Sequence, residues 1–185
     1  MARKLTVCVY CGSSAGTRPE YATAARALGR ALGERGWELV YGGGRVGLMG
    51  AVADATLAAG GTVVGIIPEH IRALEVEHTG LNALVVVDSM HSRKRQMVDR
   101  ADAFVILPGG FGTLDETFEV LTWKQLHLHD KPIFLADVAG FWDPLIALLD
   151  HTVNQGFVRL DSRALIHQVA DIPAVMAALD GLATA

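Results

Sequence analysis

Residues 103–116 have the sequence AFVILPGGFGTLDE, in which a glycine-rich turn joins an apolar segment to an amphipathic one. The apolar residues 103–107 predict a buried strand, and the pattern after the last glycine predicts a helix over residues 113–128. Glycines let backbone N–H groups approach an anion closely, and a helix N-terminus adds partial positive charge and free N–H donors. The turn at residues 109–113 therefore predicts a phosphate-binding site.

Two carboxylates, Asp115 and Glu116, fall in the first turn of this predicted helix. Acidic residues stabilise a helix N-terminus, and Thr113 with Glu116 fits a capping box, so helix stability alone can explain them. The other interpretation is that one carboxylate does chemistry. Asp115 points about 100° away from Glu116 around the helix, so the two carboxylates are not expected to face the same site.

Short apolar segments alternate with helical ones along the whole chain of 185 residues, without a linker or an internal repeat. This alternation predicts an α/β fold: one Rossmann-like domain over residues 1–185, with a mostly parallel sheet flanked by helices on both faces. The predicted strands are residues 5–10, 38–41, 62–67, 83–88, 103–107 and 132–136. The predicted helices are residues 19–35, 46–59, 90–101, 113–128, 141–155 and 172–179.

The segments that follow the predicted strands are rich in glycine and polar residues. Parallel strands end at the same edge of a sheet, and ligands of open α/β sheets bind outside that edge. We therefore expect one ligand-binding crevice, lined by residues 11–14, 42–47, 68–69, 89–93 and 109–113.

Residues 42–47, GGGRVG, fit the GxGxxG pattern of dinucleotide-binding proteins, and Glu69 lies at about the right distance for a ribose contact. However, the pattern follows the second predicted strand rather than the first, and the chain is short for a separate substrate domain. A dinucleotide-binding protein is thus the less favoured interpretation. The pattern still indicates that a phosphorylated or nucleotide-like ligand approaches this edge.

Arg93 shares one stripe of its predicted helix with Met90 and Met97, so it is expected to face protein rather than bulk water. A buried arginine needs an anionic partner, and the candidates are Glu116, a bound phosphate or both. A structural ion pair, or a side chain that extends past the methionines to solvent, is the alternative. Lys94 and Arg95 are expected nearer to solvent.

The composition limits the classes of partner. The chain is 51% hydrophobic with a net charge of −4, which favours one sizeable core and gives no broad attraction to nucleic acid or anionic membranes. No segment has the length of a membrane span or the form of a signal peptide, so a cytoplasmic protein is expected. Cys8 and Cys11 are expected to pack in a strand rather than to bind metal or do redox chemistry, and His127 and His129 to form a solvated helix end.

The pattern PGGxGTxxE at residues 108–116, with MHSRK at residues 90–94, resembles the Lonely Guy family of cytokinin-activating phosphoribohydrolases. Supporting segments that span nearly all of the chain are CGSS at 11–14, YGGG at 41–44, GLMG at 47–50 and TW at 122–123. The resemblance implies hydrolysis of an adenine nucleoside 5′-monophosphate, either AMP or an N6-substituted AMP, to free base and ribose 5-phosphate. No metal and no organic cofactor are implied.

The same resemblance assigns site residues. Arg93 and Glu116 are implied to be catalytic. The implied substrate-binding residues are Ser13, Gly43, Gly44, Glu75, Met90, Lys94, Gly109, Gly110, Phe111, Gly112, Thr113 and Thr122. Met90 is implied to border the base, whereas the Glu75 position depends on the alignment, since a shift would favour Glu77.

Glu116 suits a transition state with positive charge on the ribose, and it can also orient the attacking water. Arg93 can hold Glu116 ionised or stabilise the departing base, and the sequence does not rank these two roles. The alternative function is a noncatalytic nucleotide-binding carrier or sensor on the same fold, which needs the glycine loops but not this pair. A pyridoxal-dependent decarboxylase is not favoured, because no lysine lies in a cofactor motif.

The resemblance also implies a homodimer with the helix after Gly112 near its interface, so that the partner can complete part of the base pocket. Apolar residues on two predicted helices agree with this, and a monomer that buries them all is the alternative. These residues are Leu114, Phe118, Leu121 and Trp123 on one helix, and Val46, Met49, Val52 and Ala53 on the other.

Overall fold

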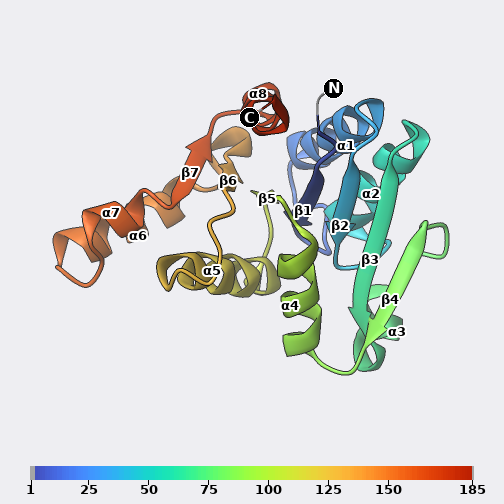
Figure 1. Cartoon of the computed structure of the whole chain (residues 1–185), viewed down its shortest axis with the longest axis horizontal. Coiled ribbons are helices and arrows are strands. Elements are labelled where there is room, and N and C mark those ends of the chain that lie inside the picture. Colours follow the sequence, from blue (N-terminus) through green and yellow to red (C-terminus); the bar gives the residue numbers. More distant parts are fainter. Residues whose placement is uncertain (1–2, 185) are drawn as a thin grey trace.

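The computed structural model describes residues 3–184 and shows a seven-stranded parallel sheet (Figure 1). The strand order is β4-β3-β2-β1-β5-β6-β7, and every neighbouring pair is parallel. The strands are β1 (Thr6–Tyr10), β2 (Glu38–Tyr41), β3 (Thr62–Pro68), β4 (Ala83–Val87), β5 (Ala103–Ile106), β6 (Ile133–Ala136) and β7 (Ile166–Val169). The predicted α/β class is thus confirmed.

Helices cover both faces of the sheet. One face packs against α1 (Pro19–Glu34), α2 (Gly47–Ala58) and α8 (Ile172–Thr184), and the other against α4 (Met90–Arg100), α5 (Phe111–Gln125) and α6 (Asp143–Asn154). The short helical segments are η1 (Glu69–Ile71), α3 (Arg72–Glu75), η2 (Val138–Gly140) and α7 (Leu160–Arg163). Within residues 3–184, no helix combines the length and the apolarity needed to cross a membrane.

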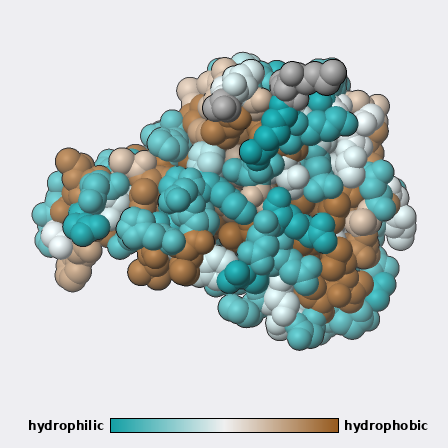
Figure 2. All heavy atoms as spheres, in the orientation of Figure 1, coloured by the Kyte–Doolittle hydropathy of each residue, from teal (hydrophilic) through white to brown (hydrophobic). Residues whose placement is uncertain are grey.

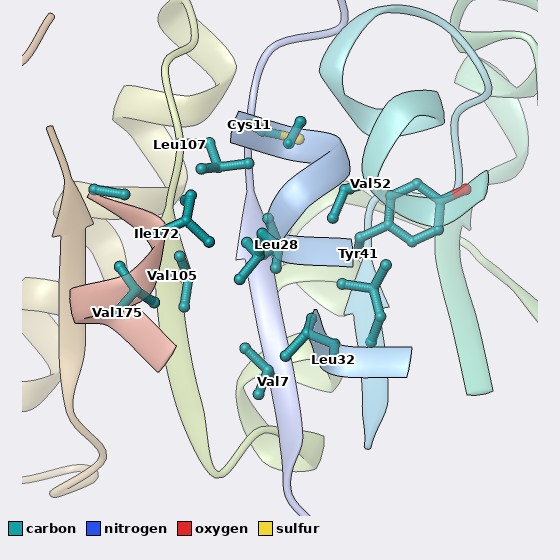
Figure 3. Packing of buried hydrophobic residues seen from close by; sticks show 14 of the residues in the cluster. Val7, Cys11, Leu28, Leu32, Tyr41, Val52, Val105, Leu107, Ile172 and Val175 are labelled. Carbon is teal, nitrogen blue, oxygen red and sulfur yellow. The ribbon is translucent and has the colours of Figure 1, made fainter. Parts of the chain in front are cut away.

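The central strand β1 has side chains in two apolar clusters, because successive strand residues point to opposite faces. Val7 and Val9 belong to the cluster shared with α1, α2 and α8, which Figure 3 shows. Cys8 and Tyr10 belong to the cluster on the α4–α6 side. Cys8 and Cys11 are free and buried, and burial raises the pKa of both thiols, which agrees with a packing role.

The predicted strands agree with the observed ones to within about a residue at each end. One strand was missed, β7, which has only four residues with exposed His167 and Gln168 in its middle and is recognisable mainly through its pairing with β6. The helix after the glycine turn begins at Phe111, two residues earlier than predicted, with Gly110 as N-cap and no side-chain cap. The capping-box interpretation is therefore wrong, and helix capping does not explain Glu116.

The chain reverses its direction of strand addition at β1, whose neighbours are β2 on one side and β5 on the other. In an open α/β sheet this reversal leaves a crevice outside the carboxyl ends of the two central strands. The loops after β1 and β5 are the ones that enter it, and they carry residues 11–14 and 109–113.

Candidate active site

A cavity of about 260 Å³ lies at this reversal point. Ser13, Gly109 and Gly110, all expected at the site, line it together with backbone of the loop after β1. Tyr21 and Phe141 form an apolar wall, with their rings edge to face 5.5 Å apart. The cavity thus has a glycine-rich side, formed by the loops after β1 and β5, and an aromatic side.

The loops around the cavity are joined by backbone hydrogen bonds. The Gly12 N–H donates to the Pro108 carbonyl at 3.0 Å, and the Gly12 carbonyl accepts from the Leu48 N–H at 3.0 Å. Gly47 has a φ of +63°, and a Cβ at that position would lie 2.3 Å from the carbonyl carbon of Ser13. The last glycine of GxGxxG is therefore required for packing against the loop after β1, a role that needs no dinucleotide.

Arg93 is buried beside the carboxyl ends of β2 and β3. Its Nη2 donates to the Glu75 carboxylate at 2.9 Å and to the Gly42 carbonyl at 2.8 Å, and its Nε donates to the Ile66 carbonyl at 3.0 Å. The side chain is 4% exposed, so it does not extend past the methionines to solvent. The candidate partners were Glu116 and a bound phosphate, but the carboxylate that bonds to Arg93 is that of Glu75.

Glu116 projects from the second turn of α5 and is only partly exposed. Burial raises the pKa of this carboxyl to about 7, and the positive charge of Arg93 limits the rise while Glu75 and Asp115 add to it. Arg93 and Glu75 therefore both act electrostatically on Glu116, although the direct bond of Arg93 is to Glu75. Such a carboxyl changes its charge near neutral pH, which is a property of groups used in catalysis.

Lys94 joins α4 to α5. Its Nζ lies 3.0 Å from an Asp115 oxygen and 3.2 Å from a Glu119 oxygen, and its side chain is 12% exposed. The expectation that it lies nearer to solvent is wrong, because these two carboxylates hold it between the helices. Burial lowers the pKa of Lys94, but the two carboxylates outweigh this effect and raise it above its ordinary value. Arg95 is 63% exposed, as expected. Lys94 thus fixes the helix of Arg93 against that of Glu116.

The two candidate glutamates of the segment after β3 have different partners. Glu75 faces Arg93, whereas Glu77 pairs with Arg72 outside the site. Glu69 also pairs with Arg72, so it does not approach the glycine motif as a ribose-binding acid would. The geometry favours Glu75 over Glu77 as the residue next to a ligand.

Of the other expected site residues, some lie at the site and others are exposed. Met90 lies at the site, since its Sδ is 3.7 Å from Arg93 Nη1, and Gly44 packs against the backbone of Glu75. Thr113 is buried beside Gly109. By contrast, Thr122 is exposed and lies about 9 Å further along α5 than Glu116, and Phe111 is 92% exposed.

One histidine differs from its expected position, and two aromatic residues of the cavity wall were not expected at the site. His129 is buried, and its ring nitrogens bond to the Val120 carbonyl at 2.9 Å and the Lys131 N–H at 3.1 Å, so the expected solvated end is wrong for this residue. Among residues 3–184, no three metal-ligating side chains are grouped. Tyr21 and Phe141 were missed because an aromatic residue in an amphipathic pattern predicts only core.

A family model described as "Possible lysine decarboxylase" matches residues 49–179. The cytokinin riboside 5′-monophosphate phosphoribohydrolase of Rhodococcoides fascians is 45% identical over 175 residues, 94% of this chain and 88% of that protein. The protein of the same name, LOG, from Oryza sativa subsp. japonica is 47% identical over 160 residues, 86% of this chain and 66% of that protein. LOG2 from Arabidopsis thaliana is 42% identical over 174 residues, 94% of this chain and 82% of that protein.

Solved structures show the same backbone in proteins of another kind. The Moco carrier protein from Chlamydomonas reinhardtii has a TM-score of 0.73 with 23% identity, covering 97% of this chain and 98% of that one. The molybdenum cofactor binding protein from Rippkaea orientalis has a TM-score of 0.72 with 20% identity, covering 97% and 98%. At this identity the likeness shows the fold alone.

The description of the family model names a decarboxylase, whose usual pyridoxal cofactor requires a lysine amine for a Schiff base. The four lysines do not fit: Lys4 is exposed before β1, Lys94 Nζ is held by carboxylates, and the Nζ atoms of Lys124 and Lys131 donate to backbone carbonyls. Within the described residues, none of them lines the cavity. With the match to the family model and 42–49% identity to proteins named for another reaction, the chain belongs to the Lonely Guy (LOG) family of cytokinin riboside 5′-monophosphate phosphoribohydrolases.

Proposed function

We propose that this protein hydrolyses the N-glycosidic bond of adenine nucleoside 5′-monophosphates, N6-substituted ones and AMP, to free base and ribose 5-phosphate. The observation that carries the proposal is the grouping of Arg93, Glu75 and Glu116 beside a glycine-rich turn at a helix N-terminus. The turn suits a phosphate, and the acidic pair suits a sugar that becomes positively charged.

The 5′-phosphate would lie on the turn formed by residues 109–113. This turn combines Gly110 as N-cap of α5 with a Gly112 whose surroundings are open, so its N–H groups are accessible to a ligand. Ser13 lines the same cavity and can donate its hydroxyl. A nucleoside without phosphate would leave these donors unused, so the monophosphate is the expected substrate form.

In the proposed reaction, water adds to C1′ of the ribose as the C1′–N9 bond breaks, and the base leaves with that electron pair and takes up a proton. Ionised Glu116 stabilises the positive charge on the ribose and orients the water. Arg93 is already bonded to Glu75 and two carbonyls, and its charge opposes the rise in the pKa of Glu116. This supports the role of keeping Glu116 ionised for Arg93, rather than contact with the departing base.

A homodimer forms part of the proposal. Exposed apolar side chains lie on α5 and directly after it, at Phe118, Leu126 and Leu128, and Figure 2 shows hydrophobic surface in this region. Thr122 lies on the same helix outside its own chain's cavity, as expected of a residue that reaches a ligand bound by the partner. On α2, however, Met49, Val52 and Ala53 are buried in the core, so they do not support an interface there. The cytoplasmic location stays a prediction.

The test is to incubate the purified protein with AMP and with isopentenyl-AMP and to measure free base and ribose 5-phosphate. Glu116→Gln and Arg93→Ala should each lower turnover by about a hundredfold or more, as the loss of a preorganised electrostatic group does. Asp115→Asn is the matched control, because this neighbouring carboxylate is exposed and Glu119 still holds Lys94. Near-normal turnover of either site variant would refute the role of that residue.

The second candidate function is a noncatalytic nucleotide carrier or sensor, and the fold shared with cofactor carriers favours it. A carrier would bind AMP in a calorimeter and release no base over hours. That result with the unmutated protein would replace the hydrolase proposal.

A further inference from the structure

The segment that carries Glu75 is attached to the loop after β2 by backbone hydrogen bonds. We call this segment, residues 75–78, the strap. The Arg45 N–H donates to the Val76 carbonyl at 2.8 Å, and the His78 N–H donates to the Gly43 carbonyl at 2.9 Å. Together they form a short antiparallel bridge. The strap therefore runs beside the glycine loop, to which the Arg93 guanidinium also donates a hydrogen bond at the Gly42 carbonyl.

One end of the strap is fixed at Arg93. Both Nη atoms of the guanidinium face the Glu75 carboxylate, at 2.9 and 3.3 Å. The same guanidinium donates to Gly42 and Ile66 carbonyls, so it cannot follow Glu75 if the strap moves. The position of Glu75 thus depends on what fixes the other end.

That other end is fixed by His78, whose ring is buried. Its Nδ1 accepts from the Gly80 N–H at 3.0 Å, which leaves Nε2 to carry the proton and donate to Asp54 Oδ1 at 2.8 Å. The Asp54 side chain is 62% exposed on α2. A surface carboxylate on a rigid helix therefore holds a buried histidine at the end of the strap.

Between the two ends, Val76 has φ 49° and ψ 83°, in the left-handed region. A β-branched residue is strained there, and such strain persists only where surrounding contacts impose it. The contacts that impose it are the Glu75–Arg93 and His78–Asp54 pairs, together with the two backbone hydrogen bonds to the glycine loop and the Glu77–Arg72 pair. Of these contacts, the His78–Asp54 pair is the one that ties the end of the strap to α2.

We propose that His78 and Asp54 are positioning residues for the reaction, acting through the strap to hold Glu75 on Arg93. The inference rests on the proposed function only in the choice of assay, because the strap and its two anchors are independent of the ligand. The His78 ring bonds to Asp54 and to the Gly80 N–H, and not to Arg93 or Glu116, so an effect of this pair on turnover is expected to pass through the strap and Glu75.

The test is a double-mutant cycle between Asp54→Ala and Glu75→Ala on base release from AMP and isopentenyl-AMP. Asp54→Ala should lower kcat/KM by about tenfold or more, since a small misplacement of site groups has effects of that size. In the Glu75→Ala background it should cause no further loss. Asp54→Asn keeps an oxygen that accepts from His78 and should restore activity to within about twofold of the unmutated protein, a split that overall destabilisation would not produce.

His129→Ala is the matched control, because this histidine is also buried with both ring nitrogens bonded, but at the far end of α5. Its effect should add fully to that of Glu75→Ala. Additive losses for Asp54→Ala, or unchanged kcat/KM in the folded variant, would overturn the proposal.

Amide hydrogen exchange separates this inference from the proposed function. Asp54→Ala should speed exchange at residues 76 and 78 without ligand, and His129→Ala should not. If the unmutated protein neither releases base nor binds AMP, the hydrolase proposal has failed, and unchanged exchange at these amides would then overturn the role of the pair independently.

Discussion

Replacing Glu116 with glutamine should make the protein more stable at pH 8 while removing its activity. Burial raises the pKa of Glu116 to about 7, from the ordinary value of 4.5 for a solvated glutamate. Between these two pH values the folded state keeps a proton that the unfolded state has released. The free energy of unfolding therefore falls as pH rises through this interval, and the loss is complete above pH 7.

The size of the effect follows from the same two values. Each pH unit in the interval costs about 1.4 kcal/mol, so ionisation of Glu116 lowers the free energy of unfolding by up to about 3 kcal/mol at pH 8. Glutamine has nearly the same shape and no charge, so Glu116→Gln avoids the loss. The difference between variant and unmutated protein should be small at pH 5 and should grow towards pH 8.

Chemical denaturation at pH 5, 6, 7 and 8 measures this difference. Glu20→Gln provides the control, because a backbone hydrogen bond and Arg18 lower the pKa of Glu20 below its ordinary value of 4.5. Glu20 is therefore ionised in both the folded and the unfolded state above about pH 6, and the stability difference for this variant should stay constant between pH 6 and pH 8. A pH-independent difference for Glu116→Gln would refute the description of Glu116 as a buried carboxyl of raised pKa. Base release by the unmutated protein should rise as pH increases through 7, since the ionised form is the active one.

Three further predictions concern the arginine, the phosphate turn and the assembly. Gly42→Ala should lower turnover by about a hundredfold, because a Cβ there would lie 2.1 Å from Arg93 Nη2, while Gly181→Ala on α8, with open space around it, should leave turnover unchanged. Free ribosides should be much poorer substrates than monophosphates, and Gly110→Val, whose Cβ would meet no protein atom within 4 Å, should fold yet lose AMP affinity in calorimetry. Light scattering at micromolar concentration should give twice the monomer mass of 19.7 kDa, and the monomer value would sink the shared site.

The fold could be predicted from the sequence because its strands are nearly all apolar and its helices amphipathic. Buried parallel strands need apolar side chains on both faces, a requirement that residues 103–107 and 5–10 show directly. The edge strand β7 lacks this signal, since His167 and Gln168 are exposed, and only the neighbouring β6 defines it. Local pattern therefore identifies the centre of the sheet better than its edge.

Burial of Arg93 could also be predicted, but its partner could not. The stripe shared with Met90 and Met97 gave the buried face, whereas Glu75 reaches the guanidinium through a short helix followed by a left-handed Val76. No periodicity in the sequence encodes such a connection. The same holds for Lys94, whose exposure depends on how α4 and α5 pack and not on either helix alone.

A shared fold does not fix the chemistry of this chain. The solved structures with 20–23% identity and TM-scores of 0.72–0.73 show the fold alone, so the function has to be argued from the chain's own side chains. What favours hydrolysis is a costly feature: Glu116 is held in surroundings that oppose its ionisation, beside a buried arginine already paired with Glu75. A carrier gains nothing from a carboxyl that destabilises the folded state above neutral pH. An enzyme gains a negative charge placed where the ribose becomes positive, and that gain explains why the arrangement is tolerated.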